Sequence, residues 1–137
     1  MSEYQTPRFL RTVMLLDAIS VLASGVPQVL GTSWLGRWTG LPSELLLATG
    51  LFLIAYAAFA SWIGTRRPIP AALVQLVVAG NMAWGVGCIG LMLFGPAALS
   101  GWGIAYLVLH LVAVLLFAVL QWTGLRRMSA GAVPMAA

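Results

Sequence analysis

One uninterrupted apolar stretch limits what this chain can fold into. Residues 71–94, AALVQLVVAGNMAWGVGCIGLMLF, contain no charged side chain. At about 1.5 Å per residue, a helix over these 24 residues spans the roughly 30 Å core of a bilayer. Of the 137 residues in the chain, 61% are hydrophobic and only 7% are charged, and the mean hydropathy is +0.99. This composition predicts an integral membrane protein without a soluble domain.

Three further apolar stretches of similar length predict four membrane-spanning helices in total. Short segments rich in glycine, proline and serine separate these stretches, and the segment 31–43 has room for one short helical turn. Residues 128–137 are predicted to form a flexible tail on composition. The predicted fold is a single all-α domain over residues 1–137, a four-helix bundle with up-down-up-down topology. The predicted spans cover about residues 9–30, 44–63, 71–94 and 104–122.

The positions of the arginines predict the orientation of the bundle. Arg37 falls on one side of the four-span arrangement, and the other six arginines fall on the opposite side. By the positive-inside rule, both termini are cytoplasmic and the loop 34–42 is outside, in a bacterial inner membrane. The chain has a pI of about 10.3, but its basic residues flank apolar spans, so we expect no binding of nucleic acid. The six arginines are Arg8, Arg11, Arg66, Arg67, Arg126 and Arg127.

Seven polar or aromatic side chains at membrane depth are candidate site residues. Asp17, Ser20 and Ser24 recur at spacings of three and four, which places them on one helical face. A carboxylate within a span costs roughly 2.5 to 3.5 kcal/mol on insertion scales, so Asp17 needs a partner. We expect Asp17 to face the third span and to join a hydrogen-bonded network with Asn81. Whether Asp17 is structural or serves a proton or a ligand stays open. The seven candidates are Asp17, Ser20, Ser24, Tyr56, Asn81, Trp84 and His110.

His110 raises the question of a cofactor. Its imidazole could ligate a haem or a chlorophyll, but the chain has one histidine, and Tyr106 and Leu107 on the preceding turn leave little room for a macrocycle. A histidine bonded to a neighbouring helix is the main interpretation, without a cofactor. The sequence contains no metal-ligand cluster, nucleophile motif, phosphate-binding loop or dinucleotide fingerprint, so we predict that the protein is not an enzyme and has no metal site.

Small residues in the third span predict a helix contact. Ala79, Ala83 and Gly87 repeat every four residues on one face. Small side chains at this spacing allow two helix backbones to approach closely in a membrane. The pattern does not distinguish a contact within the chain from one with another protein.

Three short motifs carry a resemblance to a known group of proteins. They are Asp17-Ala18 in the first span, Gly40-Leu41-Pro42 before the second, and Gly80-Asn81-x-x-Trp84 in the third. Together they resemble small four-span bacterial integral membrane proteins of uncharacterised function, over about residues 10–125. The resemblance implies a four-helix bundle but brings no substrate and no reaction.

Two functions remain compatible with the sequence. The first is a non-enzymatic accessory or structural subunit that contacts a larger membrane complex, or a second copy of itself, through its helix faces. The alternative is a small oligomeric transporter or binder of an apolar or weakly cationic solute that uses Asp17. Short loops favour the first function, whereas a carboxylate at membrane depth favours the second.

Overall fold

The computed structural model describes residues 5–131, and the secondary structure in that range consists of five α-helices. Four of them, all except α2, are long and apolar enough to cross a membrane. The predicted all-α bundle with four spans is confirmed, and the chain is a multi-pass membrane protein. The helices are α1 (Gln5–Leu30), α2 (Thr32–Thr39), α3 (Ser43–Thr65), α4 (Ala71–Phe94) and α5 (Gly101–Gly131).

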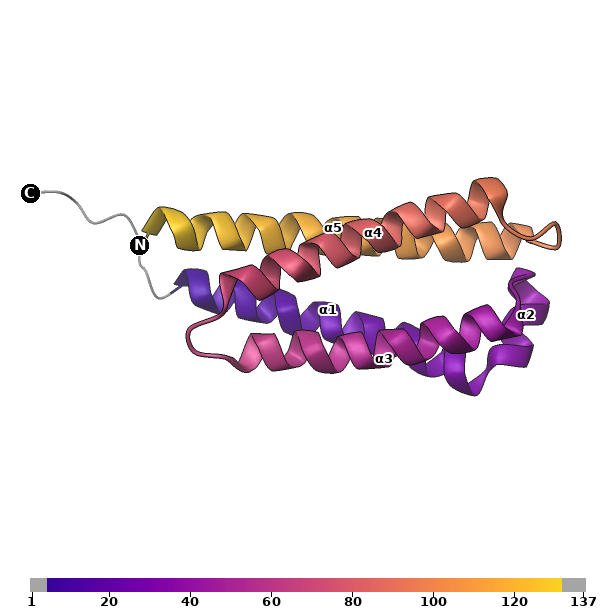
Figure 1. Cartoon of the computed structure of the whole chain (residues 1–137), viewed down its shortest axis with the longest axis horizontal. Helices are drawn as coiled ribbons and strands as arrows, with labels where there is room; N and C mark the ends of the chain where they lie inside the picture. Colours follow the sequence, from indigo (N-terminus) through magenta and orange to yellow (C-terminus); the bar gives the residue numbers. More distant parts are fainter. Residues whose placement is uncertain (1–4, 132–137) are drawn as a thin grey trace, which may run out of the picture.

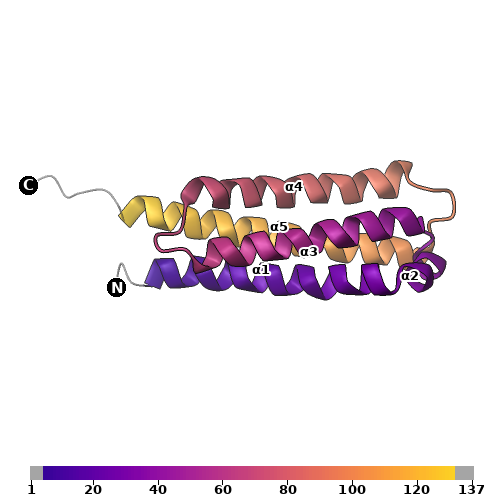
Figure 2. The same ribbon diagram turned by 60° about the horizontal axis from the view of Figure 1, so that its bottom comes forward.

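The four long helices form two antiparallel pairs. α1 packs mainly against α3 and α4 packs mainly against α5, whereas α3 and α4 contact each other little. Figure 1 shows the α1–α3 pair below the α4–α5 pair, and Figure 2 shows the same pairs from another side. α1 and α5 provide most of the contact between the pairs. The two pairs can therefore enclose space between them even though each pair is closely packed.

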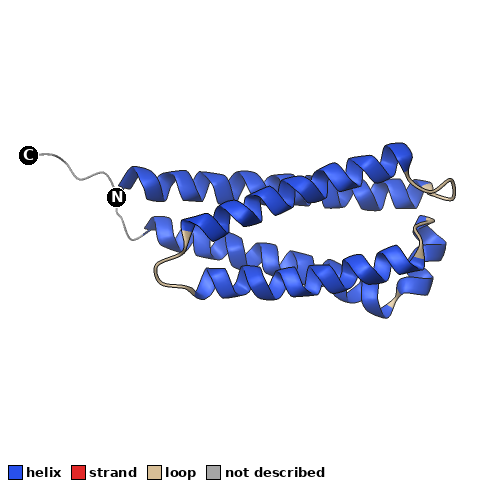
Figure 3. Cartoon of the chain, viewed as in Figure 1, coloured by secondary structure: helices blue, strands red, loops and turns tan. Residues whose placement is uncertain are grey.

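Connections at the two ends of the bundle are short, as the tan segments in Figure 3 show. We call the end with the α3–α4 connection the arginine end, because Arg66 and Arg67 lie there beside the arginines of α1 and α5. The opposite end, with α2 and the α4–α5 connection, is called the α2 end. Arg37 is the arginine of the α2 end.

A pair of glycines allows α1 and α3 to approach closely. A Cβ atom on Gly25 of α1 would lie 3.0 Å from the carbonyl oxygen of Gly50 in α3, and a Cβ on Gly50 would lie 2.8 Å from the Cβ of Gln28. Real Cβ atoms do not tolerate such distances, so this crossing requires the absence of side chains. Close backbone approach at small residues is a common way for membrane helices to pack.

Apolar packing is uneven along the bundle. One hydrophobic cluster of twelve buried residues, including Leu10, Met14 and Ile63, fills the half toward the arginine end. The cluster toward the α2 end contains only four buried residues, Leu41, Leu46, Cys88 and Leu107. The half toward the α2 end is therefore the part of the bundle with space left for cavities.

The segment predicted as a loop with one helical turn is a two-turn helix. α2 covers eight residues and ends at Gly40, which has a left-handed φ of 75° and donates its N–H to the carbonyl of Gly36. The rings of Trp34, Trp38 and Trp102 follow one another at centroid distances of 5.7 and 5.9 Å. α2 is thus held against the start of α5 by aromatic packing as well as by its connections.

The predicted tail starts too early in the sequence. α5 continues to Gly131, so residues 128–131 are helical rather than part of a flexible tail. Met128 packs against the large hydrophobic cluster, and the hydroxyl of Ser129 donates to the carbonyl of Leu125. These contacts extend the helix past the last apolar residues of the span. Residues 132–137 of the predicted tail lie outside the described part of the chain.

Candidate polar site within the bundle

A buried carboxylate joins all four long helices. Asp17 of α1 is 1% exposed, and its Oδ2 atom accepts hydrogen bonds from one side chain on each of the other three helices. The side chains, with their distances to Oδ2, are the hydroxyl of Tyr56 in α3 (3.0 Å), Nδ2 of Asn81 in α4 (3.2 Å) and Nε2 of Gln121 in α5 (2.6 Å). We call these four residues the Asp17 cluster.

The other contacts of the Asp17 cluster tie its donors together. Nδ2 of Asn81 also donates to Oε1 of Gln121 at 3.0 Å, and the Tyr56 hydroxyl lies 3.2 Å from Oδ1 of Asn81. Each amide therefore orients another member of the cluster while it donates to the carboxylate. The expected network between Asp17 and Asn81 is confirmed in its geometry.

The two carboxylate oxygens of Asp17 have different environments. Oδ2 takes all three hydrogen bonds, whereas Oδ1 is buried and has no hydrogen-bond partner among the described residues. A buried polar atom without a partner costs free energy and is uncommon in folded proteins. Oδ1 is thus the position in this cluster where a further donor can bind.

A second polar group lies nearer the α2 end and links α1, α3 and α5. Oγ of Ser24 lies 2.6 Å from Nε2 of His110. Nε2 of Gln28 donates to the hydroxyl of Tyr106 at 2.6 Å and to Oγ of Ser24 at 3.3 Å, and Oε1 of Gln28 accepts from Thr49 at 2.8 Å. We call these five residues the His110 cluster.

Geometry fixes the roles of the two nitrogens of His110. Nδ1 lies 2.9 Å from the backbone carbonyl of Tyr106, which can only accept, so Nδ1 carries the hydrogen. In a neutral imidazole Nε2 then accepts from the hydroxyl of Ser24. The predicted bond from His110 to a neighbouring helix is confirmed. Because both ring nitrogens are engaged, neither is available to ligate a haem or a chlorophyll without loss of these bonds.

Two cavities flank the centre of the bundle. The first lies between α1 and α5, has a volume of about 480 Å³ and reaches from Asp17 past His110 to Tyr106. The second lies between α3 and α4 and has a volume of about 550 Å³. Trp84, Tyr106 and His110 line both cavities and so form a partition between them. Apart from a few polar groups, both walls are apolar, which is typical of pockets that bind small organic molecules.

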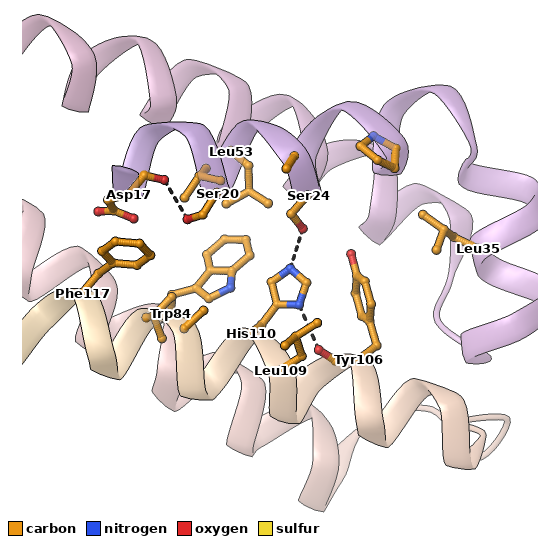
Figure 4. A pocket seen from close by; sticks show the side chains of 15 residues that line it. Asp17, Ser20, Ser24, Leu35, Leu53, Trp84, Tyr106, Leu109, His110 and Phe117 are labelled. Atoms are coloured by element: carbon orange, nitrogen blue, oxygen red, sulfur yellow. Dashed lines mark hydrogen bonds between the residues drawn. The ribbon is translucent and has the colours of Figure 1, made fainter. Parts of the chain in front are cut away.

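Figure 4 shows the α1–α5 cavity from close by. Asp17 and Phe117 lie at one end, and Tyr106 lies toward the other end, with Trp84 and His110 between them. Nε1 of Trp84 is buried and has no hydrogen-bond partner among the described residues. Two residues that line this cavity, Asp17 and Trp84, thus each carry a buried polar atom without a partner among the described residues.

The remaining candidates from the sequence occupy other positions. The hydroxyl of Ser20 donates to the backbone carbonyl of Asp17 at 2.8 Å, and Ser20 lines the α1–α5 cavity without joining either cluster. Ala79, Ala83 and Gly87 lie on the exposed side of α4, and a Cβ on Gly87 would contact nothing within 4 Å. Ala83 and Gly87 also line the α3–α4 cavity, and the packing role of all three residues stays a prediction.

Sequence reasoning missed Gln121. It is fully buried and makes the shortest bond to Asp17, at 2.6 Å. Because Gln121 precedes Trp122 near the predicted end of the fourth span, its amide was compatible with a position at the membrane interface. No sequence signal placed Gln121 within the bundle, because the extension of α5 to Gly131, which puts Gln121 in the interior of the helix, depends on tertiary contacts such as that of Met128.

No group of three or more metal-binding side chains from His, Cys, Asp and Glu comes together within the described residues. No family model, curated protein or solved structure matches this chain significantly. The resemblance to small four-span membrane proteins therefore extends, on these findings, to the four candidate spans and not to an identified family. Any function has to be argued from the bundle and its cavities.

Proposed function

We propose that this protein binds, and as an oligomer transports, an apolar or weakly cationic solute within the membrane. The main support is the α1–α5 cavity of about 480 Å³, which is mostly apolar and ends at a buried carboxylate. Cavities of roughly 300 to 1,000 Å³ with a few placed polar groups are the usual size and character of small-molecule sites. Asp17 is the charge-bearing group of the proposed site.

The weak contact between α3 and α4 supports a site between the helix pairs. In the half toward the α2 end, side-chain hydrogen bonds between the pairs come from the His110 cluster of α1, α3 and α5. Separation of two helix pairs is a common way for membrane proteins to open a path to a buried site. Four membrane-spanning helices of a single chain are too few to surround such a path completely. We therefore propose that transport requires an oligomer.

Filling the α1–α5 cavity should prevent solute binding. We expect Ala113→Phe to lower the affinity for a neutral hydrocarbon probe by about tenfold or more, equivalent to about 1.4 kcal/mol. Ala113 lines the cavity, whereas Ala105 is exposed on the same helix and lines none of the cavities described here. A diazirine-bearing probe can be crosslinked to purified protein, and its saturable labelling measured by mass spectrometry. Ala105→Phe is the matched control, and equal loss of labelling in both variants would count against the site.

An accessory or structural role is the second candidate, also non-enzymatic, and the exposed face of α4 supports it. Ala79, Ala83 and Gly87 are exposed, and Ala83 and Gly87 border the α3–α4 cavity, so another helix could pack closely there. We expect Gly87→Leu to weaken association with a second copy or with a membrane partner, as measured by native mass spectrometry and by co-purification from native membranes. A wild-type chain that extracts as a stable monomer without any partner would exclude this role.

We also propose that the arginine end is cytoplasmic, in a bacterial inner membrane. The support is the distribution of arginines, with Arg66 and Arg67 at one end and Arg37 at the other. Single cysteines at Ser2, Arg37 and Ala137, each in a Cys88→Ser background, can be labelled on intact cells with an impermeant thiol reagent. We expect labelling at position 37 alone. Labelling at positions 2 or 137 instead would reverse the orientation.

A further inference from the structure

The unpartnered oxygen of Asp17 defines more closely what the α1–α5 cavity can hold. Oδ2 is saturated by donors from α3, α4 and α5, and these donors are fixed by their own hydrogen bonds. Oδ1 belongs to the same side chain, which is 1% exposed and lines the cavity. A new donor that enters the cavity can therefore bind Asp17 only at Oδ1.

We propose that Oδ1 of Asp17 is an exchange site that holds either a proton or the ammonium group of a lipophilic amine. This inference rests on the proposed function, because the amine must occupy the α1–α5 cavity. A buried carboxylate without a counter-charge is costly, and a proton or a bound cation removes that cost. A proton neutralises the group, and an ammonium ion pairs with it. The proton and the ammonium group bind the same oxygen, so the binding of one excludes the other.

The exchange is balanced in atoms and in charge. The carboxylic acid of Asp17 loses its proton to water, and the ammonium ion donates one N–H to Oδ1 of the resulting carboxylate. One positive charge enters the site and one leaves it. The net charge of the buried site is therefore the same before and after the exchange, which avoids the large cost of an added charge at membrane depth.

Among residues 5–131, no other charged side chain is in contact with Asp17. Tyr56 of α3 is the titratable group in contact with it, whereas α4 and α5 present the neutral amides of Asn81 and Gln121. His110 of α5 lines the same cavity but bonds to Ser24 and to a backbone carbonyl. On α1 the nearest arginine, Arg11, donates to the carbonyl of Arg66 at the arginine end.

Aromatic side chains make the cavity suitable for the apolar body of a lipophilic amine. Phe117 lies four residues before Gln121 on α5, on the helical face that meets Asp17, and Figure 4 shows it at the Asp17 end of the cavity. Trp84 and Tyr106 line the cavity farther along. Aromatic faces attract cations and apolar bodies alike. Because Oδ1 is closed to solvent, a neighbouring side chain has to move before an ammonium group can reach it, and we assign this movement to Phe117.

A matched pair of probes tests the exchange. Naphthylethylamine carries the ammonium group, and naphthylethanol has the same body without the charge. Calorimetric titration of purified protein from pH 5.5 to 8.5, in buffers of different ionisation enthalpy, counts the protons released on binding. We expect release that approaches one proton per bound amine within this range, and none with the alcohol. Asp17→Asn should lower the amine affinity by about tenfold or more, abolish the release and retain binding of the alcohol.

Two further variants make the result decisive if Asp17→Asn folds poorly. Phe117→Ala keeps the carboxylate and should speed amine binding, since it removes a large side chain at the Asp17 end of the cavity. His110→Gln identifies the source of the proton: this variant should keep the release, and amine binding that continues in it without proton release overturns the proposal. Amine binding without proton release throughout the pH range also overturns it. If only the alcohol binds, the exchange is wrong and the solute site stands; if neither probe binds, the proposed function fails as well.

Discussion

Replacement of Asn81 by leucine should lower the stability of the bundle by about 2 kcal/mol or more. Asn81 donates to Oδ2 of Asp17 at 3.2 Å and to Oε1 of Gln121 at 3.0 Å. Leucine removes both bonds and leaves Oε1 of Gln121 buried without its donor. Asp17→Ala should have a similar effect, because Nε2 of Gln121 then loses its acceptor. Thermal unfolding in detergent measures both changes.

The double variant distinguishes a network from two separate contacts. In Asn81→Leu, the Asp17 carboxylate already has one hydrogen-bond donor fewer. Removal of the carboxylate in this background therefore leaves fewer buried donors without an acceptor. We expect the combined loss to fall short of the sum of the single losses by about 1 to 2 kcal/mol. Met82→Leu is the matched control, since Met82 is the next residue of α4 and is 48% exposed. Additive losses, or a loss in the control as large as that in Asn81→Leu, would contradict a shared network.

Alanine at Gly40 or Gly103 should destabilise the α2 end by about 2 to 4 kcal/mol. Gly40 has a φ of 75°, which side chains disfavour, and a Cβ atom there would lie 1.7 Å from the carbonyl oxygen of Ala98. A Cβ on Gly103 would lie 2.1 Å from the carbonyl oxygen of Thr39. In both cases the obstacle is backbone, which cannot rotate away as a side chain can. Thermal unfolding in detergent measures the loss.

A glycine in open space provides the control for this second prediction. A Cβ on Gly90 of α4 would contact nothing within 4 Å. Gly90→Ala should therefore be neutral or slightly stabilising, since alanine favours a helix by up to about 1 kcal/mol over glycine. If Gly40→Ala and Gly90→Ala unfold at the same temperature, the close contact between the α2 segment and the α4–α5 connection does not hold.

The spans themselves were predictable because hydrophobic length is a strong signal in a membrane. The uncharged stretch 71–94 coincides with α4, and the predicted start of the second span at residue 44 is one residue from that of α3. The first and fourth helices extend farther than their apolar cores, to Gln5 and Gly131. Helix extensions beyond the bilayer core depend on tertiary contacts, such as that of Met128, which hydropathy does not report.

The candidate site was predictable in part, for a similar reason. Asp17 and Asn81 stood out because polar groups at membrane depth need partners, and the two side chains do meet. Gln121 was missed because its depth depended on a helix end that the sequence placed too early. The cavities had no sequence signal at all. They depend on how the helix pairs are placed relative to each other, since one cavity lies between α1 and α5 and the other lies where α3 and α4 contact each other little.

The contacts that hold the two helix pairs together combine a shared apolar cluster with buried hydrogen bonds. Within the α1–α3 pair, glycines and apolar side chains interlock, whereas across the bundle Asp17 meets Asn81 and Gln121 through a single oxygen atom. Lipid tails can replace an apolar contact at little cost, but they cannot replace a hydrogen bond. Nearer the α2 end the His110 cluster also joins the two halves of the molecule, and at the centre their polar contact is concentrated on one carboxyl group. Whatever changes the occupant of that group also changes how firmly the halves hold each other.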